Sequence, residues 1–224
     1  CACLVGSEMC IRDSVNMLED MEKNMEGYTG SVRAVMREAK RGSLRGIHGA
    51  LSQLISVPEQ YAVAIETAFG AALQNIVTDS EGDAKRAIQF LKETKGGRAT
   101  FLPLSAVRGR MLEERGLAQC DGFVAVASDL VKCDATYEAV VKAQVGRTAV
   151  AEDMDCAIAI ARKFSYRFRI VTLDGQIINA GGSMTGGSRM QNAGFLSRSN
   201  EIEKLRTEMQ AAQAKLSEGA AAYK

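Results

Sequence analysis

The sequence lacks the features that mark several protein classes. It contains no tryptophan, two prolines and one histidine in 224 residues. No apolar run approaches the ~18 residues of a membrane-spanning helix, so a membrane span is excluded. The formal net charge is +1, which excludes a uniformly basic nucleic-acid binder but not a local basic patch. With 46% hydrophobic and 25% charged residues, the composition is that of a globular protein.

The six cysteines show no spacing typical of a metal site or a redox pair. Three lie in the first ten residues, and Cys120, Cys133 and Cys156 are far apart. Without a C-x-x-C pair, neither zinc nor a dithiol is indicated, and we expect reduced thiols in a reducing cytosol. Residues 1–14 end in a stretch that resembles translated sequencing-adapter read-through, so we expect a non-native leader there. On that expectation, the chain is an internal piece of a longer protein.

Apolar heptads near both ends predict a coiled coil. Alternating spacings of three and four connect Leu18, Met21, Met25, Tyr28, Val32 and Val35, and also Ile202, Leu205, Met209, Ala212 and Leu216. Either run alone is also typical of an amphipathic helix on a core. Two such runs flanking a different pattern favour an antiparallel hairpin with a globule at its tip. Gly27 and Gly30 weaken the first helix by roughly 1 kcal/mol each, so we expect the coil to loosen there.

Between the heptads the pattern predicts a mixed globule. Apolar periodicity predicts helices over residues 56–70, 80–96, from 134 and over 157–164. Strands are predicted over residues 74–78, 98–104, 123–127, 148–151, 166–172 and 176–179. Residues 166–172 alternate as a strand with one solvated face, and Asp174-Gly175 predicts a hairpin turn after it. The fold class is therefore α+β or mixed α/β, in two lobes.

Several motifs in a fixed order resemble one family. They are GIHGAL at residues 46–51, AIETAFGAALQNIV at 64–77, GRATFLPL at 97–104, YRFRIVTLDG at 166–175 and GGSMTGGS at 181–188. Together they closely resemble the hinge domain of SMC (structural maintenance of chromosomes) proteins. The FLSRS stretch at 195–199 is most similar to bacterial SMC. The sequence departs from the family at Ala180, where the family often has proline.

The resemblance implies a two-lobed hinge globule on an antiparallel coiled coil. Its expected segments are a leader over 1–14, an N-terminal coil stub over 15–43, the hinge globule over 44–190 and a C-terminal coil stub over 191–224. It implies a non-catalytic module that pairs two SMC chains as a two-fold homodimer, forming a V or ring, in chromosome condensation and segregation. Family hinges also bind DNA near the coil junction. The family's ATPase heads, with their ATP, magnesium and accessory subunits, are absent here, so no cofactor is expected in this fragment. The implied location is cytoplasmic and nucleoid-associated.

The glycine-rich run is the predicted dimer interface. It comprises Gly181, Gly182, Ser183, Met184, Thr185, Gly186 and Gly187. The hairpin at Asp174-Gly175 is expected to leave this run at a sheet edge, where its backbone groups are unpaired. Glycines there permit close approach of a second backbone. The alternative is a small-molecule or nucleotide-binding α/β enzyme that uses this loop. A P-loop, however, needs lysine after its last glycine, where Ser188 and Arg189 stand, and the run leads into polar coil through Gln191 and Asn192.

Other catalytic constellations are weak. His48 has no second histidine and no G-x-S-x-G partner. Asp153 and Asp155 precede a predicted helix, where acidic residues favour the N-terminal dipole, so we interpret them as a helix start rather than a carboxylate pair. The sequence therefore predicts no catalytic residue set and no metal site.

Basic residues gather at two places. Arg33, Arg37, Lys40, Arg41 and Arg45 lie at the first junction of coil and globule, and Arg167 and Arg169 lie on the predicted strand face. A solvated helix face and a DNA contact explain the first cluster equally well. The predicted DNA-contacting residues are Arg37, Lys40, Arg41, Arg45, Arg167 and Arg169. No aromatic residue interleaves with them, so any binding is expected to be phosphate-led and independent of sequence.

Overall fold

The structure is a computed structural model that describes residues 2–187 and 194–221. The chain divides into two compact units, which are described separately. One is the coil unit, Cys1–Gly27 with Ser197–Lys224, and the other is the globule, Tyr28–Leu196. The polar coil predicted over residues 188–192 lies outside the described residues. In the part described, no helix has the length and apolar character needed to cross a membrane.

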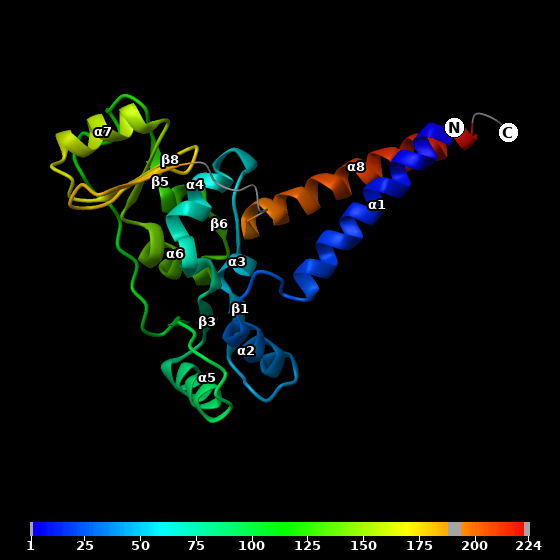
Figure 1. The fold of residues 1–224 in the computed structure, drawn as a ribbon, viewed down its shortest axis with the longest axis horizontal. Coiled ribbons are helices and arrows are strands. Elements are labelled where there is room, and N and C mark those ends of the chain that lie inside the picture. The colour runs from blue at the N-terminus through cyan, green and yellow to red at the C-terminus, as the bar shows by residue number, and fades with distance from the viewer. Residues whose placement is uncertain (1, 188–193, 222–224) are drawn as a thin grey trace. The chain divides into compact units, whose positions relative to one another are not determined.

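The coil unit contains two long helices side by side (Figure 1). They are α1 (Ala2–Lys23) and most of α8 (Phe195–Ala221). Arg206 Nη2 donates to Glu19 Oε1 at 2.7 Å, and Arg198 Nη1 donates to the Glu26 carbonyl at 3.2 Å. The earlier residue of α8, Arg198, thus contacts the later N-terminal residue, Glu26, and the later one, Arg206, contacts the earlier one, Glu19. The two segments therefore run antiparallel. The predicted antiparallel pairing is confirmed, and α1 begins at Ala2, within the segment expected to be a leader.

The first heptad run is not one helix, which corrects the expected N-terminal coil stub. Helix α1 ends at Lys23, and α2 (Gly30–Lys40) begins a second helix in the globule. Between them Met25 and Gly27 have φ of 53° and 90°, which the right-handed helix does not allow. Val32 and Val35, assigned to the coil seam from sequence, are buried in the globule instead.

A three-stranded sheet forms one part of the globule. Its order is β1 (Ile47–Ala50), β3 (Ile76–Thr78) and β4 (Phe101–Pro103), with β1 antiparallel and β4 parallel to β3. Helices α2 and α5 (Glu81–Glu93) pack against each other and on this sheet. The Ser80 hydroxyl accepts a hydrogen bond from the backbone N–H of Asp83 and so caps α5 where the sequence predicts its start.

A five-stranded sheet forms the other part. Its order is β10 (Met184–Thr185), β9 (Ile177–Ile178), β8 (Arg169–Thr172), β7 (Thr148–Ala151) and β5 (Phe123–Val126). Helix α7 (Met154–Lys163) covers one face and α4 (Glu59–Phe69) contacts the other (Figure 1). Ile170 and Val171 face opposite helices, and both are fully buried. The solvated face predicted for this strand is therefore wrong.

Short elements fill the middle of the globule. They are α3 (Leu51–Leu54), α6 (Glu138–Val145), the paired strands β2 (Ile55–Ser56) and β6 (Lys132–Cys133), and the 3-10 turns η1 (Gly70–Gln74), η2 (Ala127–Leu130) and η3 (Ala135–Tyr137). The larger hydrophobic core joins α4, through Ile65 and Phe69, to α6 and to Val171 of the five-stranded sheet. The structure thus combines helices with a three-stranded, a five-stranded and a two-stranded sheet, and the predicted mixed α+β fold is confirmed.

Candidate dimer interface and basic surface

The glycine-rich run forms a hairpin turn and an edge strand. The Asn179 N–H donates to the Ser183 carbonyl at 2.8 Å, and the Gly182 N–H donates to the Asn179 carbonyl at 2.9 Å. Gly181 and Gly182 have φ of 87° and 94°, a conformation that glycine adopts without steric cost. Strand β10 follows directly, so the run does not open a helix as a dinucleotide loop does. It lies at the predicted place, the edge of a sheet.

Met184 presents both its backbone and its side chain at this edge. In an antiparallel pair, successive residues alternate between hydrogen bonding with the neighbour strand and pointing away from it. Ser183 bonds to Asn179, and Thr185 stands opposite Ile177. The N–H and C=O of Met184 are therefore directed away from β9, and its side chain is 51% exposed.

The Gln176 side chain makes two hydrogen bonds to the backbone of Gly187, just after the C-terminal end of β10. Its Oε1 accepts the Gly187 N–H at 2.9 Å, and its Nε2 donates to the Gly187 carbonyl at 3.3 Å. A Cβ on Gly186 would overlap this amide, whereas a Cβ on Gly187 would meet open space. Gly186 is thus needed for packing against Gln176 within one chain, whereas a side chain at position 187 would meet no atom of the same chain.

The first basic cluster lies on an exposed face of the globule. Arg37, Lys40 and Arg41 are exposed on or just after α2, and Arg45 is exposed in the following loop. Arg41 pairs with Glu38 at 2.7 Å. Helix α5 packs beside α2 and adds three exposed basic residues, Lys85, Arg86 and Lys92. This extension cannot be predicted from the sequence, because the two helices are distant along the chain.

The second basic pair does not form a shared surface. Arg167 Nη2 bonds to Glu114 Oε2 at 2.8 Å and remains 61% exposed. The guanidinium of Arg169 donates to the carbonyls of Ala68 and Thr67 at 2.9 and 3.1 Å. Burial lowers the pKa of Arg169. These carbonyls end α4, where the helix dipole attracts a cation, so Arg169 is half-buried against α4 instead of lying on a solvated face.

The chain enters and leaves the globule at a pair of aromatic rings. The rings of Tyr28 and Phe195 lie 4.5 Å apart, and the Tyr28 hydroxyl is 2.7 Å from Ser52 Oγ. Beside them the buried Glu66 accepts the Leu196 N–H at 2.8 Å, capping the first turn of α8. No sequence spacing points to this carboxylate.

The residues considered for catalysis have structural partners. His48 Nε2 is 2.7 Å from Asp79 Oδ1, and His48 Nδ1 is 3.0 Å from the Tyr137 hydroxyl. Asp153 accepts the Cys156 N–H at 2.8 Å, and this hydrogen bond lowers the pKa of Asp153. Asp153 is thus the N-cap of α7, which confirms its interpretation as a helix start. Within the described residues, no group of three His, Cys, Asp or Glu is placed to hold a metal ion.

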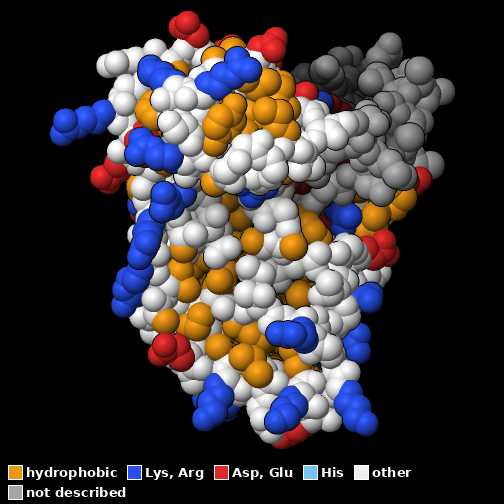
Figure 2. Space-filling model, turned by 60° about the vertical axis from the view of Figure 1, so that its left-hand side comes forward, with side chains coloured by type: hydrophobic (Ala, Val, Ile, Leu, Met, Phe, Trp, Pro, Cys, Tyr) orange, Lys and Arg blue, Asp and Glu red, His pale blue; other side chains and the backbone are white. Residues whose placement is uncertain are grey.

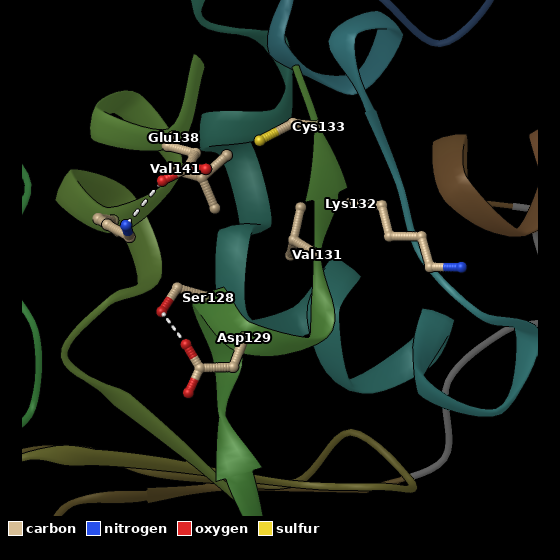
Figure 3. A pocket seen from close by; sticks show the side chains of 8 residues that line it. Ser128, Asp129, Val131, Lys132, Cys133, Glu138 and Val141 are labelled. Atoms are coloured by element: carbon tan, nitrogen blue, oxygen red, sulfur yellow. Dashed lines mark hydrogen bonds and ion pairs between the residues drawn. The ribbon is translucent and has the colours of Figure 1, made fainter. Parts of the chain in front are cut away.

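A cavity of about 350 Å³ lies between η2, β6 and α6 (Figure 3). Glu138 pairs with Lys142 at 2.8 Å across one side, and the Ser128 hydroxyl donates to Asp129 at 3.4 Å. Burial, followed by the charge of Glu138, raises the pKa of the Cys133 thiol. A thiol held in its protonated form is a poor nucleophile, so the cavity offers no activated group.

Comparisons with known proteins fit this geometry. The family model described as SMC proteins Flexible Hinge Domain matches residues 44–161. The Chromosome partition protein Smc of Bacillus subtilis (strain 168) is 43% identical over 196 residues, 86% of this chain and 16% of that protein. The protein of the same name from Halothermothrix orenii is 41% identical over 198 residues, 87% of this chain and 16% of that protein. The chain thus spans about 16% of the length of these relatives.

Solved hinge structures share the fold. A crystal structure of an asymmetric dimer of the Geobacillus stearothermophilus SMC hinge domain has a TM-score of 0.87 and 39% identity, covering 98% of this chain and 90% of that one. The Pyrococcus furiosus SMC hinge domain has a TM-score of 0.61 and 32% identity, covering 81% of this chain and 92% of that one. On the matched residues, the identities and the shared fold, this chain belongs to the SMC flexible hinge domain family.

Proposed function

We propose that this chain is the dimerisation hinge of a chromosome-partition SMC protein, and that two copies pair through the open edge of β10. The observation that carries the proposal is Met184, whose N–H and C=O point away from β9 at the edge of the five-stranded sheet. An open edge offers these groups to a strand of another chain. The dimeric hinge of Geobacillus stearothermophilus, at 39% identity, supports a second copy as the partner.

A two-fold assembly makes the pairing occur twice. If β10 of each copy meets the other lobe of its partner, the same contact recurs on both sides of a closed ring. One substitution then damages both contacts. This arrangement joins two SMC arms into a V or ring, which is the mechanical role we propose in chromosome condensation and segregation.

The edge is tested by Met184→Pro. Proline removes the outward N–H, while Ser183 keeps its bond to Asn179 and Thr185 its pairing with Ile177, and edge strands tolerate proline. We expect folded monomers by sedimentation velocity, with an unchanged circular dichroism spectrum. Met184→Leu keeps the N–H and is the matched control, for which we expect dimers. A proline variant with the wild-type dimer mass would falsify pairing at this edge.

The glycine run gives a second test of the same edge. Gly187 has φ of 137° and open space around its Cβ position. Gly187→Ala therefore introduces the backbone strain of a non-glycine residue but no large side chain, and it is the control for the glutamate variant. Gly187→Glu adds bulk and charge. We expect the alanine variant to dimerise and the glutamate variant to be monomeric. Gly182→Glu is also expected to give monomers, but its Cβ would lie 3.5 Å from the Tyr166 ring, so it also strains the turn.

DNA contact is proposed for the exposed basic residues on α2 and α5. The surface comprises Arg37, Lys40, Arg41, Arg45, Lys85, Arg86 and Lys92. Two adjacent helices that carry exposed basic side chains suit a phosphate backbone, which is bound without reading bases, although Arg41 and Arg86 also pair with Glu38 and Asp83. Arg169 is left out because its guanidinium holds the end of α4. The ATPase heads, their ATP and magnesium, and accessory subunits are proposed for the longer protein, which we place on the nucleoid in the cytoplasm.

A further inference from the structure

We infer that the cavity between η2, β6 and α6 binds a linear aliphatic diamine, with one ammonium group at each of two carboxylates. The cavity has a volume of about 350 Å³, which lies within the range of small-molecule sites. Its lining combines acidic side chains with apolar ones, and both kinds are needed for this ligand. The inference is independent of the pairing proposed at β10.

The two carboxylates lie at opposite ends of the cavity. Figure 3 shows Asp129 beside Ser128 at one end and Glu138 at the other, with Val131 between them. Asp129 is exposed, and its Oδ1 accepts a long hydrogen bond of 3.4 Å from the Ser128 hydroxyl. Within the described part of the chain, no cation pairs with Asp129. An ionised carboxylate accepts several hydrogen bonds, so Asp129 has capacity for an ammonium group.

Lys142 shows how an ammonium group binds at the other end. Its Nζ is 2.8 Å from Glu138 Oε2, which leaves Glu138 Oε1 for a second donor. The hydrogen bond and charge of Glu138, followed by the charge of Asp129, raise the pKa of Lys142. The charge of Glu138 also adds to the effect of burial in raising the pKa of Cys133. Positive charge is therefore favoured in the cavity and negative charge is disfavoured.

The wall between the carboxylates is apolar. Val141 is buried, Val131 is half-buried, and the Cys133 thiol is held in its neutral form. The methylene groups of a diamine would cover these side chains and remove them from water. A hydrated metal ion would leave the wall uncovered, and among the described residues no group of three His, Cys, Asp or Glu is placed to hold one. An anion would be repelled by both carboxylates.

The rest of the protein does not attract cations in general. The formal net charge is +1, and Lys and Arg side chains line the left margin and the lower end of the face in Figure 2. Lys132 lines the cavity, but its side chain points away from the other lining residues (Figure 3). Diamine binding is therefore expected to be local and saturable, instead of a diffuse attraction to an acidic surface.

Isothermal titration calorimetry with putrescine, a short linear diamine, tests the site. We expect saturable binding of one putrescine per chain at physiological ionic strength. n-Butylamine has the same carbon chain but a single ammonium group. We expect it to bind about tenfold or more weakly, because one charge-assisted hydrogen bond is lost.

Matched variants locate the binding. Asp129→Asn and Glu138→Gln each remove one negative charge and keep the shape of an exposed side chain. We expect each to lower the affinity for putrescine about tenfold or more. Glu59→Gln removes an exposed acid of α4 outside the cavity and should bind as the wild type does. In the wild type, putrescine should also shift the methyl NMR resonances of Val131 and Val141.

The outcomes decide both the site and the ligand class. Binding that does not saturate, or an equal loss in Glu59→Gln and the cavity variants, would mean that putrescine only screens surface charge, and the inference would be wrong. Equal affinity for n-butylamine would show that the second carboxylate is not used and would overturn the diamine assignment. Since neither cavity variant changes β10, the result stands whatever the dimer mass of Met184→Pro.

Discussion

Glu19 links the two helices of the coil unit through one side chain. The hydrogen bond from Arg206, aided by the charges of Arg206 and Lys23, lowers the pKa of Glu19 below its usual value. A carboxyl whose pKa is lowered by folding adds stability above its unfolded pKa, and that stability is lost as pH falls through the folded pKa. Since the pair is exposed to solvent, the contribution is small and sensitive to salt.

We therefore predict that Glu19→Gln lowers the melting temperature of the helices at neutral pH. The difference from wild type should vanish once the pH falls below the folded pKa of Glu19, because both side chains are then uncharged. Circular dichroism melts at a series of pH values measure this difference. Glu22→Gln changes an exposed acid on the same helix and serves as the control. A constant difference at all pH values would mean that the ion pair is not its source.

Single residues are where the sequence predictions failed most clearly. The spacing of Ala84, Ala87, Ile88 and Leu91 predicts one buried stripe on α5. Ile88 is exposed instead, because the other three residues occupy the buried face. Arg169 was assigned to a solvated face because its strand alternates, but helices cover both faces of that strand. Periodicity along one element does not reveal which neighbours pack against it.

At the scale of elements, the last turn of α4 connects two distant parts of the globule. Its carbonyls at Thr67 and Ala68 receive Arg169 of the five-stranded sheet. One residue earlier, Glu66 accepts the Leu196 N–H at the start of α8. The helix end attracts the cation, and the carboxylate suits the positive end of α8. The root of α8 is thus held by a buried charge-assisted hydrogen bond.

We predict that Glu66→Ala loosens the first turn of α8. A hydrogen bond to a charged group contributes about 2 kcal/mol, so the Leu196 amide should exchange with deuterium markedly faster. Glu66→Gln keeps an acceptor oxygen and should give an intermediate rate. Glu59→Ala, at the exposed start of the same helix, is the control. Unchanged exchange at Leu196 in the alanine variant would contradict the capping role.

The basic surface on α2 gives a prediction for DNA binding. Replacing Arg37, Lys40, Arg41 and Arg45 with glutamate should abolish binding to a random-sequence duplex in fluorescence anisotropy, while the dimer mass stays the same. For the wild type, affinity should fall with salt by about one log-log unit per phosphate contact. Arg167→Glu, at a residue paired with Glu114, is the control. Full binding by the quadruple variant would place the DNA site elsewhere.

Elements with strong local patterns were predictable. Strand β7 has the expected bounds, and α5 and α7 begin where the sequence predicts, after Ser80 and Asp153. Strand β1 escaped prediction because a bulge between Ile47 and Gly49 interrupts its pairing. Helix α2 was placed in the coil because its apolar spacing continues the heptad of α1. Only the left-handed residues between them separate the two helices.

For the whole molecule, the order of the motifs identified the family, and the glycine run was correctly expected at a sheet edge. The sequence could not show that β4 is the last strand of the three-stranded sheet and lies beside α5, because that arrangement arises only when α5 and β4 pack together.

The Tyr28–Phe195 contact has a consequence for chain topology. Because the rings lie 4.5 Å apart, the globule is an insertion whose two ends meet. Such a unit tolerates circular permutation: a short linker can join the ends, and new termini can open in the exposed loop at Arg108. For the same reason the globule can be transferred between proteins as a unit, and the helices outside it can differ in length or sequence without changing its fold.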